Sequence, residues 1–426
     1  MQDANRMEDF ALNSATHASA PGFSGQTALP PRLSLPRIVE MNLGFFGLQF
    51  SFGLQQANMT PIYTFLGADE ATMPLLWLAG PMTGLIIQPI VGALSDRTRS
   101  KLGRRTPYFL IGAVICSLCL FLMPYSSALW MAASLLWLLD AGNNITMEPY
   151  RAYVADRLEP GQRPAGFLVQ SAFTGLAQCL SYATPSLLVG FGISQNLVDL
   201  NGIPVIVRIA FVIGAILSIS TIVWSVVRVP ELKLSDSELA VLAAQPSGAA
   251  AALAEIRDAF IAMPRPMRQL AWAMLCQWYA MFVYWQFISL SVSRTLFPAG
   301  NGASGSAGAD FISASLTAQQ MGVAYNAVAF VAALALIPIV RNLGAKHVHA
   351  ACLVASAIAM LSLPMIDSRA LLFVPMIGIG LGWAGMMGNT YVMLADCIPP
   401  ERTGVYMGIF NMFIVVPMLI ETMTCR

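Results

Sequence analysis

The sequence predicts an all-α membrane protein made of two helical bundles that are related by an internal repeat. Hydrophobic residues make up 57% of the 426 residues and charged residues only 11%, with a mean hydropathy of +0.66, whereas soluble domains carry about 25% charged residues. Apolar stretches of about 20 residues, the length that crosses a bilayer, recur along the chain. The motif ADRLEP at 155–160 returns as ADCIPP at 395–400, each after a long apolar stretch. We therefore expect two consecutive repeats of the same helical pattern.

Eleven segments are predicted to span the membrane. In order they cover residues 38–66, 74–94, 107–125, 128–155, 165–192, 204–227, 268–292, 318–340, 347–366, 370–395 and 403–420. The polar segment 1–36 lacks a basic start followed by an apolar core, so we expect a disordered tail rather than a signal peptide. Residues 37–227 form the expected first bundle of six helices, residues 228–267 a linker loop, and residues 268–426 a second bundle of five helices.

The eleventh segment is short for a membrane span. Residues 404–420 would extend about 25 Å, against a hydrocarbon core of about 30 Å, and Glu421 follows at once. A repeat of six helices would also need a twelfth segment. We therefore expect a chain truncated at helix 11, with the last helix of the second bundle incomplete.

Basic residues lie mostly on one side of the predicted membrane. With the N-terminus inside, most of the 23 Lys and Arg residues fall in the tail or in the loops after even-numbered segments. Because loops rich in Lys and Arg stay in the cytoplasm, the N-terminus and the linker loop are predicted to be cytoplasmic. Arg greatly outnumbers Lys, which indicates a GC-rich bacterial genome and hence the bacterial inner (plasma) membrane.

Composition and motifs exclude several classes of function. A net charge of +1 argues against electrostatic binding of nucleic acid. The seven Cys lie mostly in apolar stretches, and the CxxC motif of Cys116 and Cys119 has no second pair or His cluster beside it, so we expect neither a metal nor a cofactor. With three His and no nucleotide-binding loop or catalytic triad, the chain is not predicted to be an enzyme.

The loop after the second span, GALSDRTRSKLGRRTPY at 92–108, is the most specific motif of the sequence. Membrane topology explains its basic residues, but not its G-x-x-x-D-R start or its compact GRR end. The motif resembles the inter-span signature of the major facilitator superfamily, whose fold consists of two six-helix bundles. The resemblance implies that Asp96, Arg97, Gly103, Arg104 and Arg105 belong to a gate that joins the bundles at their cytoplasmic side.

Charged residues also occur inside the predicted fourth span, where charge is costly. At 100° per residue, Asp140 and Arg151 point within roughly 20° of each other, and Asn144 and Glu148 complete one polar stripe. Asp140 and Arg151 lie about 16 Å apart along the helix, which is too far for them to pair. Glu148 could pair with Arg151, and Arg151 would then have only a structural role at the inner edge of the span. A charge near the membrane midplane costs about 3 kcal/mol, and protonation of Asp140 would remove that cost, as proton coupling requires.

Three motifs together, GLIIQPIVGALSDRTRSKLGRRTPY, LQQANMTP and LLDAGNNITMEPYRAYVAD, resemble the proton-coupled sucrose symporters, relatives of the glycoside–pentoside–hexuronide cation symporters. In those proteins the fourth span carries an Asp, an Asn pair and an Arg in this order. The resemblance implies that Asp140 is the proton-coupling acid and that Asn144 and Arg151 bind substrate. Glu148 has no counterpart in the plant pattern, so its role stays open.

A sugar site needs amides or charged groups for the hydroxyls and aromatic rings for the sugar faces. Further candidates at a suitable depth are Gln55, Asn58, Gln277, Trp278, Tyr284 and Asn389. Each also has a structural interpretation, the amides as interhelical hydrogen bonds and the aromatic residues as packing or interface groups. Gln55 is favoured because its surroundings follow the family pattern.

The predicted function is secondary active transport, a proton-coupled symport of a disaccharide or glucoside such as sucrose or maltose. We expect a monomer whose partners are the sugar, protons and membrane lipid. One alternative is a sodium-coupled glycoside permease of the melibiose type, but the lack of an acid in 74–94 argues against it. An alternative of another class is a non-transporting sugar sensor, which would need a signalling domain larger than the 228–267 loop.

Overall fold

The computed structural model describes residues 30–68, 76–77, 79–194, 197, 205–233, 239–240, 249–296 and 309–424. In these ranges the first half of the chain forms the long helices α2 (Leu35–Phe65), α4 (Ala79–Arg97), α5 (Thr106–Leu122), α6 (Leu129–Arg157), α7 (Arg163–Gly190) and α8 (Val205–Arg228). The second half forms α11 (Arg265–Leu296), α12 (Ala309–Leu343), α13 (Ala345–Ser362), α14 (Pro375–Ala395) and α15 (Thr403–Thr424). Every predicted span coincides with one of these helices. The predicted tail, 1–36, lies outside the described residues as far as residue 29.

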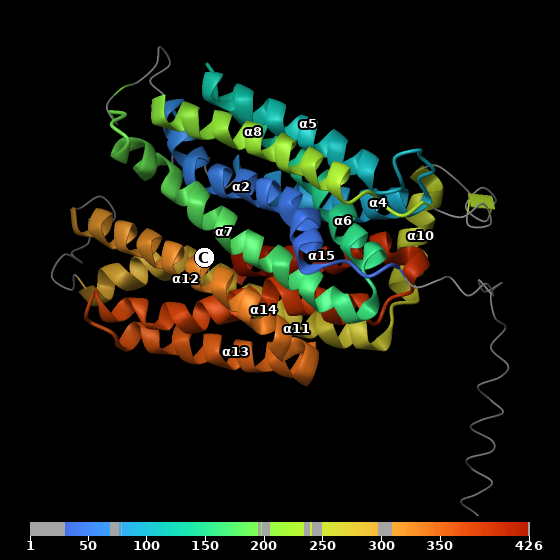
Figure 1. The fold of residues 1–426 in the computed structure, drawn as a ribbon. Helices are drawn as coiled ribbons and strands as arrows, with labels where there is room; N and C mark the ends of the chain where they lie inside the picture. The colour runs from blue at the N-terminus through green and yellow to red at the C-terminus, as the bar shows by residue number, and fades with distance from the viewer. Residues whose placement is uncertain are drawn as a thin grey trace, which may run out of the picture. The chain divides into compact units, whose positions relative to one another are not determined.

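The two groups of helices meet along two contacts within residues 32–426. Helix α15 packs against α4 and α6 of the first half as well as α11, and α7 of the first half packs against α12 and α14 (Figure 1). Glycine allows both contacts to be close. A Cβ atom on Gly92 of α4 would lie 2.3 Å from the carbonyl oxygen of Gly404, and one on Gly175 of α7 would lie 2.7 Å from that of Asn326.

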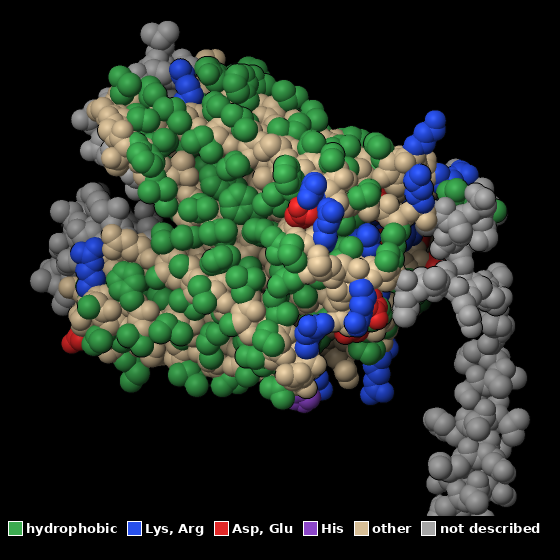
Figure 2. Space-filling model, viewed as in Figure 1, with side chains coloured by type: hydrophobic (Ala, Val, Ile, Leu, Met, Phe, Trp, Pro, Cys, Tyr) green, Lys and Arg blue, Asp and Glu red, His purple; other side chains and the backbone are tan. Residues whose placement is uncertain are grey.

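Six of the described helices, α5, α8 and α12 to α15, are long and apolar enough to cross a membrane by length and composition. Four of the other long helices, α2, α4, α6 and α7, carry most of the buried polar side chains, which lowers their hydropathy. Figure 2 shows the consequence on one face, where hydrophobic side chains cover the flank and Lys and Arg gather at the end where α10 lies. Polar groups thus face the interior and apolar groups the outside, as a lipid solvent requires.

The segment predicted as a linker loop, 228–267, contains a helix, α10 (Ala249–Ile261), so the prediction of a loop is wrong for this part. Its sequence AAAALAEIRDAFI is rich in Ala, the residue with the highest helix propensity. Helix α10 packs against α4 and α15, and this contact stabilises a helix that is short by itself.

Candidate functional site

A column of polar side chains follows helix α6 through the interior of the protein. Asp140, Asn144, Glu148 and Arg151 are all buried, with 1%, 3%, 0% and 2% of their surface exposed. Four-residue and three-residue spacings place them on one side of the helix, as the sequence predicts. Each is held by residues of other helices, so the column is best described level by level.

Asp140 forms the first level. Its Oδ1 accepts a hydrogen bond of 2.6 Å from Nε2 of Gln55 on α2. Its Oδ2 is buried without a hydrogen-bond partner, and no cation pairs with it among the described residues. The hydroxyl of Tyr63, also on α2, is likewise buried without a partner. A carboxylate in this position has one donor and no counter-charge, which is costly in a low-dielectric interior.

Asn144 forms the second level and ties α6 to α4. Its Oδ1 accepts a hydrogen bond of 2.5 Å from Nε2 of Gln88, and its Nδ2 donates one of 2.9 Å to Oγ1 of Thr83. The sequence analysis did not single out Thr83 or Gln88. Both stand as isolated polar residues in an apolar span, which is the pattern that could have identified them.

Glu148 and Arg151 form the third level and reach the second half of the chain. Nη1 of Arg151 lies 3.2 Å from Oε1 of Glu148, so the predicted pair is present. The same Nη1 donates a hydrogen bond of 2.9 Å to Oδ1 of Asn411 on α15, and Nδ2 of Asn411 donates to Oε1 of Glu148. The guanidinium also lies over the ring of Tyr391 on α14, 4.0 Å from its centroid. Arg151 thus contacts helices of both halves.

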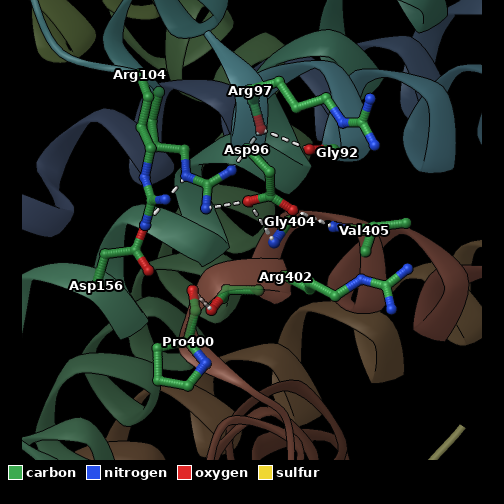
Figure 3. A network of polar contacts seen from close by, with 12 residues as sticks. Gly92, Asp96, Arg97, Arg104, Asp156, Pro400, Arg402, Gly404 and Val405 are labelled. Atoms are coloured by element: carbon green, nitrogen blue, oxygen red, sulfur yellow. Dashed lines mark hydrogen bonds and ion pairs between the residues drawn. The ribbon is translucent and has the colours of Figure 1, made fainter. Parts of the chain in front are cut away.

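A latch between the halves lies at the C-terminal end of α4 (Figure 3). Oδ1 of Asp96 accepts the N–H of Gly404 at 3.0 Å and Oδ2 accepts the N–H of Val405 at 2.8 Å. These N–H groups belong to the first turn of α15, which has no partners inside the helix and favours a negative charge. The fully buried Arg105 pairs with the Asp96 carboxylate, and its Nε lies 3.1 Å from Oδ2 of Asp156. One carboxylate of the first half therefore caps a helix of the second.

The remaining predicted gate residues surround this latch. Nη2 of Arg104 lies 2.9 Å from Oδ2 of Asp156. Gly103 has a positive φ of 107°, and a Cβ there would meet the carboxylate of Glu231. This carboxylate accepts the backbone N–H groups of Arg104, Arg105 and Thr106. Arg97 points away from Asp96, and its Nε lies 2.5 Å from Oε2 of Glu255 on α10.

The linker helix also reaches the second half. Oε1 of Glu255 lies 3.4 Å from Nε of Arg402, and Nη2 of Arg402 donates a hydrogen bond of 2.9 Å to the backbone carbonyl of Glu255. Glu255 thus contacts arginines from both halves. Sequence reasoning missed this residue because nothing in a polar segment marks which acid will find a partner.

The other predicted sugar ligands do not join the column through any contact of the described residues. Nδ2 of Asn58 donates to the carbonyl of Leu54 in its own helix. Oε1 of Gln277 lies 2.9 Å from Nε2 of His349 on α13, and the Trp278 ring packs against Trp383 at 5.6 Å between centroids. The two last candidates are also buried, with the Tyr284 hydroxyl directed to the sulfur of Met376 and the Asn389 amide without a hydrogen-bond partner.

The sequence profile of the Major Facilitator Superfamily matches residues 41–420. The chain belongs to the major facilitator superfamily. It is 34% identical over 179 residues to "Sucrose transport protein SUC4" of Arabidopsis thaliana, a match covering 37% of this chain and 35% of that protein. It is 27% identical over 196 residues to "General alpha-glucoside permease" of Schizosaccharomyces pombe, covering 42% and 35%. These matches span about a third of the relatives' own lengths.

The proton:xylose symporter XylE has the same fold, with a TM-score of 0.64 at 14% identity over 92% of this chain and 88% of that structure. Membership of the superfamily and this likeness confirm the predicted helical fold, and the chain is an integral multi-pass membrane protein. The relatives are transport proteins by name, in agreement with the prediction that the chain is not an enzyme.

Proposed function

We propose that the chain is a secondary active transporter that carries a disaccharide or glucoside, such as sucrose or maltose, together with protons. The observation that carries this proposal is the buried Asp140 carboxylate, which has one hydrogen-bond donor and no cation partner in the described part of the chain. The names of the matched relatives support the substrate class, since they are a sucrose transporter and an alpha-glucoside permease.

The contact between Asp140 and Gln55 provides a physical link between proton and sugar. An ionised carboxylate holds the Gln55 amide by a charge-assisted hydrogen bond, which is stronger than a bond to a neutral carboxyl group. Protonation of Asp140 weakens that hold and leaves the Gln55 amide available for a sugar hydroxyl. Proton binding then favours sugar binding, and by linkage sugar binding favours the proton.

We assign sugar binding to groups that line the column and to candidates in the second half. Asn144 and Arg151 offer donors within the column. Among the remaining candidates, Asn58, Gln277, Trp278 and Tyr284 would exchange their present contacts for the sugar. The Asn389 amide has no hydrogen-bond partner to lose. The latch around Asp96 serves as the cytoplasmic gate, because it bonds the end of α4 in the first half to the start of α15 in the second.

The same proposal gives the protein its orientation. The end that carries α10, the latch and the gathered basic side chains is the cytoplasmic end, in line with the positive-inside rule. A bacterial inner membrane and a monomeric state complete the proposal. Sodium coupling is disfavoured, because the helix sequence of α4 holds no acid before Asp96.

Uptake of labelled sucrose and maltose into proteoliposomes tests the proposal. A pH gradient, acidic outside, should drive accumulation, whereas a sodium gradient alone should not. Asp140→Asn should abolish accumulation but retain the exchange of labelled for unlabelled sugar, since exchange moves no net proton. Asp367→Asn serves as the matched control, because Asp367 is an exposed acid in a loop. Accumulation by Asp140→Asn at the control's level, or accumulation driven by sodium alone, would overturn the assignment.

A further inference from the structure

A second buried carboxylate lies in the column and contacts the other half of the protein directly. Glu148 is fully buried, and its Oε1 receives both the Arg151 guanidinium and the Nδ2 of Asn411. Asn411 is 2% exposed, and its Oδ1 accepts hydrogen bonds from Arg151 and from the hydroxyl of Tyr391 at 2.9 Å each. We call these four residues the inner bridge. It joins α6 of the first half to α14 and α15 of the second.

Few charged, titratable or polar groups contact the Glu148 carboxylate. The charged group that faces it is Arg151 on its own helix, and the titratable group is Tyr391 on α14. Helix α15 offers the neutral Asn411 and α2 offers the Phe45 ring, 5.7 Å from the guanidinium. No ion pair or hydrogen bond from α4, α5 or α7 to Glu148 occurs among the described residues, and its Oε2 is buried without a partner.

We propose that Glu148 is a second proton-binding carboxylate, distinct from Asp140, and that its protonation opens the inner bridge and frees Arg151 for the sugar. The proposal rests on the proposed function, because it names a further step of the same transport cycle. In the ionised state Glu148 holds Arg151 and Asn411 together and so ties α6 to α15. A proton on its free Oε2 neutralises the carboxylate without displacing any group, because that oxygen has no partner to lose.

The consequence for Arg151 follows from charge. Hydrogen bonds to a neutral carboxyl group are weaker than those to a carboxylate, so both contacts to Oε1 weaken when Glu148 is protonated. A guanidinium without a counter-charge in a dry interior then gains more from new acceptors, and sugar hydroxyls supply them. Asp140 cannot produce this effect, because it makes no contact with the second half among the described residues and lies about 16 Å along α6 from Arg151.

Sugar exchange at two pH values tests the proposal. In the wild type, the half-saturating sugar concentration for exchange should be at least about threefold lower at pH 5.5 than at pH 7.5, as a linked proton requires. Glu148→Gln imitates the protonated side chain, so its half-saturating concentration at pH 7.5 should lie below the wild-type value at pH 7.5, and only the smaller pH dependence that Asp140 imposes should remain. Glu148→Asp keeps a titratable group and should keep a pH dependence. If Glu148→Gln shows the wild-type difference between the two pH values, or binds sugar more weakly at both, the proposal is wrong.

A second measurement examines the bridge without any sugar. Thermal unfolding of the purified protein is compared for Glu148→Gln, Asn411→Ala and the double variant at pH 7.5. Because both changes remove the same contact, the loss of melting temperature in the double variant should be smaller than the sum of the single losses. Additive losses would overturn the bridge. If the wild type exchanges no sugar while the losses are non-additive, the proposed function fails and the bridge stands.

Discussion

Replacement of Asp96 by Asn should release the latch between the halves while keeping the size of the side chain. The carboxylate accepts two backbone N–H groups of α15 and pairs with Arg105, and both charged side chains are buried. Asn keeps one acceptor oxygen but loses the charge. In the wild type the carboxylate belongs to α4 of the first half and binds the start of α15 of the second half. Its removal therefore weakens the contact between the halves rather than either half alone.

The size of the effect follows from these contacts. Hydrogen bonds to a charged group contribute about 1.5–3 kcal/mol, and neutral ones about 0.5–1.5 kcal/mol, so one bond to α15 weakens by about 1 kcal/mol and the other, which faces the Asn amide nitrogen, is lost at about 2 kcal/mol. Breaking a buried ion pair costs about 3–5 kcal/mol, but Arg105 keeps Asp156 as a partner and most of this cost is avoided. We take about 3 kcal/mol in total, which is roughly a hundredfold change in the ratio of closed to open forms.

Distances between spin labels at the end of the protein that carries the latch measure this ratio. Labels at Arg99 and Lys346 occupy exposed positions in the first and second halves. Asp96→Asn should move much of the distance distribution to longer values. Asp396→Asn is the control, since this acid, the repeat counterpart of Asp156, is 57% exposed and lies 3.9 Å from Arg163, a pair worth at most about 1 kcal/mol. Unchanged distances in Asp96→Asn, or equal changes in both variants, would refute the reasoning.

Three further changes test neighbouring contacts. Gly92→Ala should also open the end that carries the latch, with a cost to the closed form of about 1–3 kcal/mol, because its Cβ would lie 2.3 Å from the Gly404 carbonyl oxygen. Gly161→Ala, at a position with open space, should leave the same spin-label distances unchanged. Glu255→Ala should change the free-energy difference between closed and open forms by about 1 kcal/mol or less, and so shift those distances less, since its arginine partners are partly exposed. A shift as large as that of the latch variant would contradict this ranking. Glu231→Ala should lower the melting temperature and reduce the free energy of unfolding by about 1–2 kcal/mol, because it removes the acceptor for the N–H groups at the start of α5. An unchanged melting temperature would show that water replaces this acceptor.

Local sequence patterns were sufficient for several parts of the site. The stripe of Asp140, Asn144, Glu148 and Arg151 follows from helix periodicity alone, and the pairing of Glu148 with Arg151 follows from their spacing of three residues. The spans follow in the same way from their length and apolar composition. Such features depend on neighbours in the chain, so no knowledge of the packing is needed.

Other parts of the site depended on which helices meet. The segment with α10 reads as a polar loop, and only its contacts with α4 and α15 explain why a short Ala-rich helix is stable there. Gln277 and Trp278 are plausible sugar ligands by residue type, yet they lie against His349 and Trp383 inside the second half. Residue type and depth in the membrane do not determine the direction in which a side chain points.

The sequence by itself determined that this protein is a membrane-embedded helical repeat with charges in its fourth span, because lipid imposes length, apolarity and orientation on each span separately. Only the tertiary structure decided that Asn411 joins Glu148 and Arg151 and that Asp96 caps α15. These contacts link residues that are more than 250 positions apart, and they arise from the packing of one half against the other. A single Asn in an apolar span has no partner until that packing supplies one.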